Sequence, residues 1–356
     1  MGIISNNSLQ VDTGLLRRSQ GLHLQHLESF SSSASGAVLG PLGNNTESSS
    51  PLTPPDTPES QQRRDFREAR YVSQNVIRKV ILKDSGFMDE SVMSLSDYDE
   101  YNKLPRVVKC NRTRITPTVD IHRDTNGHCF YSGLSKCGSV WSCPVCCAKI
   151  QQFRRSEIEV LIDWAVTNDY QLVMPTLTIP HYESQTISEL MEKLTIAKSY
   201  FTSGNGWKRF KEKVDFQGLV RSLEVMYGAN GWHPHFHELW VVSKDVDAQY
   251  LVSYVRERWE KGCQKAGLIP RGKLRDFRRH GVQVSLSVNG SDYFAKQDND
   301  NYLKGMASEI SLGVLKKSRK TIHPFQLALL ASEDYPGASE KFLEYVNSMK
   351  GKAQIY

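Results

Sequence analysis

Residues 224–240, EVMYGANGWHPHFHELW, contain the side chains best suited to metal chemistry. Asn230-Gly231 favours a two-residue hairpin loop of type I′, in which both central residues need a positive φ angle. Counting outward from that loop places Glu224 opposite His237, and alternation along a strand puts His235 on the same face. Two imidazoles and a carboxylate converging at this distance form a three-ligand divalent-metal site with open positions, which could bind and polarise a phosphodiester.

A plain alternative is a surface hairpin whose polar residues meet by chance, since His-x-His pairs are common. His233 has the same strand parity as His235 and His237, but Pro234 delays regular pairing beside it. We therefore expect His233 to support a ligand or to contact DNA, and leave it outside the predicted ligand set.

Residues 290–304, GSDYFAKQDNDNYLK, offer an attacking group. Tyr293 and Lys296 stand at positions i and i+3 of a helix expected over residues 292–310, so they share one face. A tyrosine hydroxyl can attack a phosphodiester and leave a phosphotyrosine and a free 3′-hydroxyl. The charge of Lys296 could stabilise the transition state or favour the deprotonated hydroxyl. The chain has 15 tyrosines, so Tyr293 is a candidate only in combination with the metal site.

Most of the seven cysteines are clustered, with the close Cys-x2-Cys spacing of a metal knuckle at residues 143–146. In a reducing compartment such clusters are more often metal ligands than disulfides. The predicted ligands of a structural Zn²⁺ are Cys110, Cys137, Cys143 and Cys146. Cys129 or His128 could replace Cys110, whereas Cys147 is expected to point away and Cys263 to pack in a helix core. Buried or free cysteines without a metal are the alternative.

Segments rich in Lys and Arg could follow a DNA backbone, and aromatic residues among them could stack unpaired bases. Such segments occupy residues 207–213 (WKRFKEK), 271–279 and 316–320. A solvated charged face is the alternative for any single residue. The predicted DNA-contacting residues are Lys208, Arg209, Lys316, Lys317 and Arg319.

These residues must be positioned by both helices and strands. Periodicity predicts strands over 172–179, 219–227, 235–242 and 282–288, and short strands around the cysteines between 107 and 130. It predicts helices over 66–82, 148–167, 187–201, 248–266 and 325–349, the last interrupted near 336–337. Thr186 and Glu189 form a capping box that starts the 187–201 helix. Without regular βαβ alternation, the pattern indicates an α+β fold with a mainly antiparallel sheet.

Composition divides the chain into four parts. Residues 1–65 form a Ser/Pro-rich tail expected to be disordered, 66–150 an N-terminal region with the cysteine knuckle, 151–331 the domain with the predicted metal site and nucleophile, expected to be the nuclease, and 332–356 a helical tail. Hydrophobic residues make up 39% and the net charge is +6, which agrees with a globular protein and a nucleic-acid partner. No apolar run long enough for a membrane helix and no secretory leader are visible, so we expect a cytoplasmic protein without a membrane partner.

Several ordered motifs together resemble the HUH endonuclease superfamily. GWHPHFHELW (231–240) is similar to its His-hydrophobe-His motif, PTLTIPH (175–181) to its first motif and the Tyr293–Lys296 segment to its third. CGSVWSCPVCCAKI (137–150) and KKSRKTIHPFQLALLA (316–331) narrow the resemblance to rolling-circle plasmid replication initiators with an N-terminal cysteine knuckle. It covers about residues 105–331, and placing the histidines before the tyrosine separates the chain from conjugative relaxases.

The resemblance implies a central antiparallel sheet flanked by helices, with His235 and His237 binding Mg²⁺ or Mn²⁺ and Tyr293 as nucleophile beside Lys296. It implies plasmid origin DNA, single-stranded or in a hairpin, as substrate. The chain has no convincing phosphate-binding loop, so a host helicase and replication machinery are expected partners. Glu224 as third ligand rests on the hairpin count.

The sequence departs from some of these relatives at the residue expected to activate water when the reaction terminates. Asn289 stands where some relatives have a glutamate four residues before the tyrosine. Asp292, Tyr302 and Glu309 are the remaining candidates for that step. Three other functions stay open: an HUH single-strand transposase, a zinc-dependent DNA-binding regulator without nuclease activity, and a metallohydrolase that uses a water nucleophile.

Overall fold

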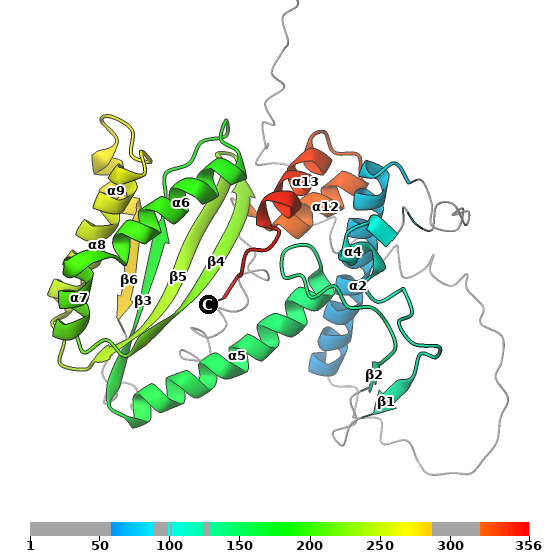
Figure 1. Ribbon diagram of the computed structural model, residues 1–356, viewed down its shortest axis with the longest axis horizontal. Coiled ribbons are helices and arrows are strands. Elements are labelled where there is room, and N and C mark those ends of the chain that lie inside the picture. Colours follow the sequence, from blue (N-terminus) through cyan, green and yellow to red (C-terminus); the bar gives the residue numbers. More distant parts are fainter. Residues whose placement is uncertain (1–57, 88–98, 100–101, 124–128, 287–320, 356) are drawn as a thin grey trace, which may run out of the picture.

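The computed structural model describes residues 58–87, 99, 102–123, 129–286 and 321–355 (Figure 1). In chain order the elements are α2 (Pro58–Asp84), α4 (Arg106–Lys109), β1 (Ile121–Arg123), β2 (Cys129–Tyr131), α5 (Pro144–Thr167), β3 (Tyr170–Thr178), α6 (Ile187–Phe201), α7 (Gly204–Lys213), β4 (Gly218–Gly228), β5 (Gly231–Ser243), α8 (Ala248–Lys265), α9 (Leu274–His280), β6 (Val282–Leu286), β7 (Thr321–Ile322), α12 (Pro324–Ser332) and α13 (Ala338–Met349).

The central feature is a five-stranded sheet in the order β6-β3-β5-β4-β7, and every neighbouring pair is antiparallel. β5, which carries the His-hydrophobe-His sequence, lies in the middle. Helices flank the sheet, so the predicted α+β class with a mainly antiparallel sheet is confirmed.

Alternation along β5 divides its side chains between two differently covered faces. Trp240 and its neighbours of the same parity pack against α6, α7 and α8 through a cluster of aromatic rings that includes Phe201 and Phe210. On the opposite face, Leu239 and Val241 pack against Ile158 and Ile162 of α5, among other apolar residues. The histidines share the face of Leu239.

The C-terminal helix α12 packs against the N-terminal helix α2. α12 and α13 pack against each other, and α12 contacts α2, as the neighbouring red and blue helices in Figure 1 show. After α13 the chain returns to the sheet, where the Leu223 N–H donates to the carbonyl of Gln354 and Ser222 bridges Ile355. The last described residues therefore extend the sheet at the edge of β4.

Most predicted elements are present, with altered bounds. α6 has the predicted limits, and the Thr186–Glu189 capping box is formed. α5 begins at Pro144 rather than 148, because the Cys143 side chain caps its first turn and proline suits the first helical position. It continues without a break across residues 150–151, where the sequence predicts a domain boundary.

Two other expectations need correction. Residues 58–65, assigned to the disordered tail, are helical because Pro58 starts α2 and helix-favouring Glu, Gln and Arg follow it. Between 107 and 130 the chain forms the short helix α4 as well as the strands β1 and β2. α7 and α9 were not predicted. Among the described helices, none combines the length and apolar character needed to cross a bilayer.

Candidate active site and metal centres

The β4–β5 hairpin has a register two residues away from the predicted one. Gly228 pairs with Gly231, so Ala229 and Asn230 form the loop, and Glu224 lies opposite His235 rather than His237. Gly231 adopts a φ of +82°, and an added Cβ there would lie 2.9 Å from the Glu183 Cα. The positive φ and this close approach leave room only for glycine at position 231. A shift of two residues preserves the face of every side chain, so the predicted convergence survives the wrong register.

Glu224, His235 and His237 meet on this face. The Glu224 Oε2 lies 2.9 Å from the Nε2 of His235 and 3.0 Å from that of His237, and the two Nε2 atoms are 3.1 Å apart. Ligands at adjacent corners of an octahedron of about 2.1 Å radius lie about 3.0 Å apart. All three side chains are buried. The donor atoms thus fit one face of an octahedral divalent ion and leave its other positions for substrate or water.

Both imidazoles are oriented through their Nδ1 atoms. The Nδ1 of His237 lies 3.1 Å from the Thr176 hydroxyl on β3, and the Nδ1 of His235 lies 3.3 Å from the carbonyl oxygen of His233. A carbonyl can only accept, so the His235 proton belongs on Nδ1 and the Nε2 lone pair is left for a ligand. Such contacts fix ring orientation and ligand basicity in metal sites. His233 therefore supports a ligand through its main chain.

The surroundings keep the site anionic. Burial raises the pKa of Glu224, but the contacts of its carboxylate with the His235 and His237 imidazoles outweigh this effect and hold that pKa below the ordinary value. Burial, helped by the neighbouring His235, lowers the pKa of His233 to about 3, and burial also lowers the pKa of His181. The His181 and His233 Nδ1 atoms lie 3.2 Å apart, so these two rings form a neutral pair beside the carboxylate.

A buried ion cluster lies on the other face of β5, next in sequence to His237. Glu238 is fully buried, and its Oε1 lies 2.6 Å from both the Lys198 Nζ and the Arg221 Nε. The Trp240 indole N–H donates to its Oε2 at 2.8 Å. Burial lowers the pKa of Lys198 to about 8, against the opposing effect of Glu238. These contacts fasten β5 to β4 and α6 beside the candidate ligands.

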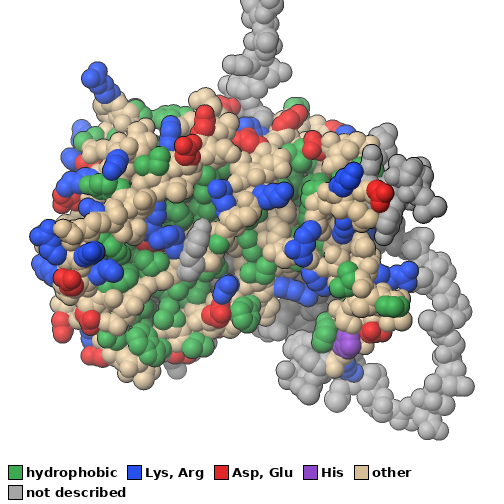
Figure 2. Space-filling model, viewed as in Figure 1, with side chains coloured by type: hydrophobic (Ala, Val, Ile, Leu, Met, Phe, Trp, Pro, Cys, Tyr) green, Lys and Arg blue, Asp and Glu red, His purple; other side chains and the backbone are tan. Residues whose placement is uncertain are grey.

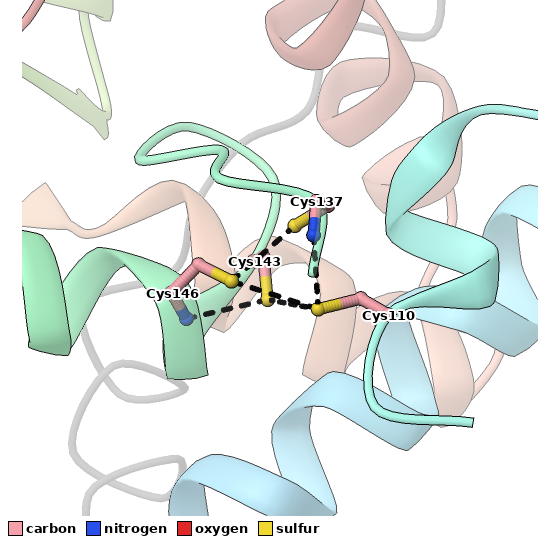
Figure 3. Close-up of side chains that lie close together, drawn as sticks. All are labelled: Cys110, Cys137, Cys143 and Cys146. Atoms are coloured by element: carbon pink, nitrogen blue, oxygen red, sulfur yellow. Dashed lines mark hydrogen bonds between the residues drawn. The ribbon is translucent and has the colours of Figure 1, made fainter. Parts of the chain in front are cut away.

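The four predicted zinc ligands also come together (Figure 3). The Cys110 Sγ lies 3.5 Å from that of Cys146 and 3.9 Å from that of Cys143, and the Cys137 and Cys146 sulfurs are 3.6 Å apart. Sulfurs around a tetrahedral zinc with bonds of about 2.3 Å are separated by about 3.8 Å. All four side chains are buried, so the sulfur arrangement suits a closed structural metal site.

The other cysteines lie outside this cluster. Cys129, the alternative to Cys110, is exposed on β2, and Cys263 is buried in α8. Burial raises the pKa of Cys147 to about 12, which suits an inert thiol in the core. On α2, the Gln74 side-chain amide donates to the Cys143 sulfur at 3.0 Å and links that helix to the cluster.

Two of the five predicted DNA-contacting residues lie in the described part of the chain. Lys208 and Arg209 are exposed on α7, but Trp207 and Phe210 of the same segment are buried, so its aromatic rings serve the core and cannot stack on bases. Lys and Arg side chains gather over the end of the molecule formed by α7, α8 and α9 (Figure 2). The candidates Tyr293, Lys296, Lys316, Lys317 and Arg319, and the termination candidates Asp292, Tyr302 and Glu309, lie outside the described residues.

Comparison with known proteins relates part of the chain to a protein family. Residues 134–269 match the replication protein family. The chain thus resembles replication (Rep) proteins over part of its length. It is 26% identical to "Protein rep" of Streptomyces lividans, over 31% of this chain and 30% of that protein. It is 27% identical to "Neomycin resistance protein" of Streptomyces cyanogenus, over 33% of this chain and 32% of that protein. The alignments thus span about a third of each curated relative. No solved structure matches the chain significantly.

The matched segment holds most of the two clusters. Glu224, His235 and His237 all lie within residues 134–269, as do three of the four clustered cysteines. Cys110 precedes the matched segment and Tyr293 follows it. The segment that matches the replication protein family therefore carries the carboxylate–histidine site, and Cys110, which lies outside the segment, completes the cysteine cluster.

Proposed function

We propose that this chain initiates rolling-circle replication of plasmid DNA by nicking one strand of the origin and holding the new 5′ end on a tyrosine. The observation that carries the proposal is the buried group of Glu224, His235 and His237, whose ligand atoms lie 2.9–3.1 Å from one another within the segment that matches the replication protein family. In this assignment the protein is an HUH-type endonuclease and strand transferase.

The metal-binding role falls to Glu224, His235 and His237. A bound Mg²⁺ or Mn²⁺ would polarise the scissile phosphate and offset the charge that develops on it. Glu224 supplies the anionic ligand, and the contacts to Thr176 and to the His233 carbonyl hold the imidazoles in the ligating orientation.

We assign the nucleophile to Tyr293. Its hydroxyl oxygen attacks the phosphorus, the bond to the 3′ oxygen breaks, and the products are a 5′-phosphotyrosine and a free 3′-hydroxyl that primes synthesis. Lys296 would stabilise the charged transition state. The segment bearing both residues is joined to β6 at one edge of the sheet and to β7 at the other, with the candidate ligands on the strands between.

The four clustered cysteines are proposed to bind one structural Zn²⁺. They come from the end of α4, the segment before α5 and the first turn of α5. A closed tetrahedral site of this kind stabilises the fold without taking part in the reaction. The remaining partners are plasmid origin DNA, single-stranded or in a hairpin, and a host helicase with the replication machinery.

The deciding experiment is a covalent-adduct assay. A labelled single-stranded oligonucleotide spanning a mapped nick site is incubated with Mn²⁺ and wild-type protein, Tyr293→Phe, Glu224→Gln or the control Tyr170→Phe, whose ring stacks on Trp164 at the far end of β3. We expect a denaturant-resistant adduct with the wild type and the control only. An adduct surviving in Tyr293→Phe would transfer the role to another tyrosine, Tyr302 first.

Other outcomes would favour the competing functions. Cleavage without an adduct would indicate a water nucleophile, and binding without cleavage would indicate a DNA-binding regulator. Cleavage confined to the terminal hairpins of a mobile element, without nicking of a supercoiled plasmid, would indicate a transposase.

A further inference from the structure

Between Cys110 and Cys137, residues 111–123 and 129–136 form a two-stranded ribbon whose two arms begin at clustered cysteines. The Asn111 N–H donates to the Ser135 carbonyl at 2.8 Å, and the Ser135 N–H donates to the Thr113 carbonyl at 2.8 Å. Further out, the antiparallel strands β1 and β2 pair from Ile121 with Tyr131 to Arg123 with Cys129. We call residues 111–123 and 129–136 the cysteine-based ribbon.

The ribbon has a defined internal structure. Gly133 adopts a φ of +80°, and a side chain there would collide with the Thr116 hydroxyl and the Thr118 carbonyl. The loop before β1 is therefore folded tightly against the opposite arm. Across the ribbon, the rings of His122 and Phe130 stack with centroids 5.1 Å apart. These contacts set the side chains in place before any partner binds.

Both faces of the ribbon are exposed. All six residues of β1 and β2 are exposed, including Ile121 at 69%, Phe130 at 48% and Tyr131 at 55%. Within the described part of the chain, the main packing partner of each strand is the other. A two-stranded ribbon carrying large apolar side chains on exposed surface marks a site of interaction.

Charge indicates what that partner is. Residues 102–123 and 129–137 contain seven basic residues and a single acidic one, Asp120; the basic residues are Lys103, Arg106, Lys109, Arg112, Arg114, Arg123 and Lys136. Figure 2 shows apolar, histidine and basic side chains next to one another at the place where Figure 1 shows β1 and β2. Exposed aromatic rings within positive charge are the features that bind single-stranded nucleic acid, since bases stack and phosphates pair.

We propose that the cysteine-based ribbon binds unpaired DNA, with bases stacked on Phe130 and Tyr131 and phosphates held by Arg114, Arg123 and Lys136. The inference extends the proposed function, because it gives the DNA strand a second contact remote from the candidate ligands. In Figure 1 the ribbon and the five-stranded sheet lie at opposite ends of the molecule. A strand bound at both places would be held along much of the protein.

The test measures binding, not cleavage. Fluorescence anisotropy follows a labelled oligothymidylate of about 20 nucleotides, which lacks an origin, with wild-type protein and with Phe130→Ala, Tyr131→Ala and the double variant. We expect each single variant to weaken binding about tenfold and the double variant more, while blunt duplex DNA binds almost unchanged. The matched control is Phe153→Ala, which removes an aromatic ring 62% exposed on α5.

Equal affinities in wild type and double variant would overturn the proposal, as would an equal loss for Phe153→Ala. Should Phe130→Ala disturb the ribbon, Phe130→Leu keeps its bulk but removes the aromatic face, and it should also bind weakly. Failure of the proposed function shows separately, as absence of the wild-type adduct on an origin oligonucleotide, whatever the ribbon variants do.

Discussion

Thr176 on β3 lies directly opposite His237 on β5, with its hydroxyl 3.1 Å from the imidazole Nδ1. The contact orients the ring so that its Nε2 points to Glu224. We predict that Thr176→Val, which keeps the shape but loses the hydroxyl, weakens Mn²⁺ binding about 10- to 100-fold. Isothermal titration with Mn²⁺ measures the change, and excess Mn²⁺ should restore nicking.

The control for this variant is Thr178→Val. Thr178 lies on the same face of β3 and opposite His235, yet its side chain makes no hydrogen bond to either imidazole among the described residues. An equal loss of affinity in Thr178→Val would mean that strand packing, and not the hydroxyl, explains the effect.

We predict that the stability of the fold depends on a metal ion bound by the cysteine cluster. Cys143→Ser should reduce bound zinc from about one ion per chain to almost none and lower the thermal midpoint by roughly 10 °C, since a closed zinc site contributes folding free energy. Metal content by mass spectrometry and a melting curve measure both effects. Cys129→Ser, at an exposed cysteine outside the cluster, should change neither. Unaltered zinc in Cys143→Ser would remove that residue from the ligand set.

Part of the site was predictable because of strand periodicity. Alternation alone places Glu224, His235 and His237 on one face in either register, so the local pattern is enough to predict their convergence. The exact pairing was not predictable. The Asn230-Gly231 signal favours those two residues as the loop, but Gly231, with a φ of +82°, pairs with Gly228 and begins β5.

Other features stay ambiguous or hidden in the sequence because they depend on contacts between segments distant in the chain. Trp207 and Phe210 alternate with basic residues and thus resemble a base-stacking segment, but the amphipathic helix α7 turns both rings into the core. Cys110 and Cys129 were both compatible with the spacing, and only the folded chain brings Cys110 to the other sulfurs. The ion cluster around Glu238 is equally invisible in sequence, because Lys198 comes from a separate helix.

His323 should make the fold sensitive to acid. Its buried side chain caps α12 by accepting from the Phe325 N–H, and burial lowers its pKa to about 4. The unfolded chain binds a proton near pH 6.5 and the folded chain only near pH 4, so stability is full above pH 6.5 and falls as the pH drops through this window. The loss amounts to roughly 3 kcal/mol at most.

His323→Asn tests this sensitivity, because asparagine can cap the helix but does not titrate. Urea unfolding at pH 7 and pH 4.5 should show a smaller difference in unfolding free energy for the variant than for the wild type. An identical difference in the two proteins would assign the acid sensitivity to other groups.

The buried carboxylate of Glu238 should contribute more to stability than any exposed ion pair. Glu238→Gln leaves Lys198 and Arg221 without their anionic partner inside the protein, which should cost about 3–5 kcal/mol of unfolding free energy. Lys198→Met in the same background removes one uncompensated charge and should recover part of the loss. The exposed pair Lys261–Glu257 provides the control, because Glu257→Gln should change stability by less than about 1 kcal/mol. Chemical denaturation of the four proteins measures these differences, and a double variant no more stable than Glu238→Gln would contradict the assignment of the penalty to the buried lysine.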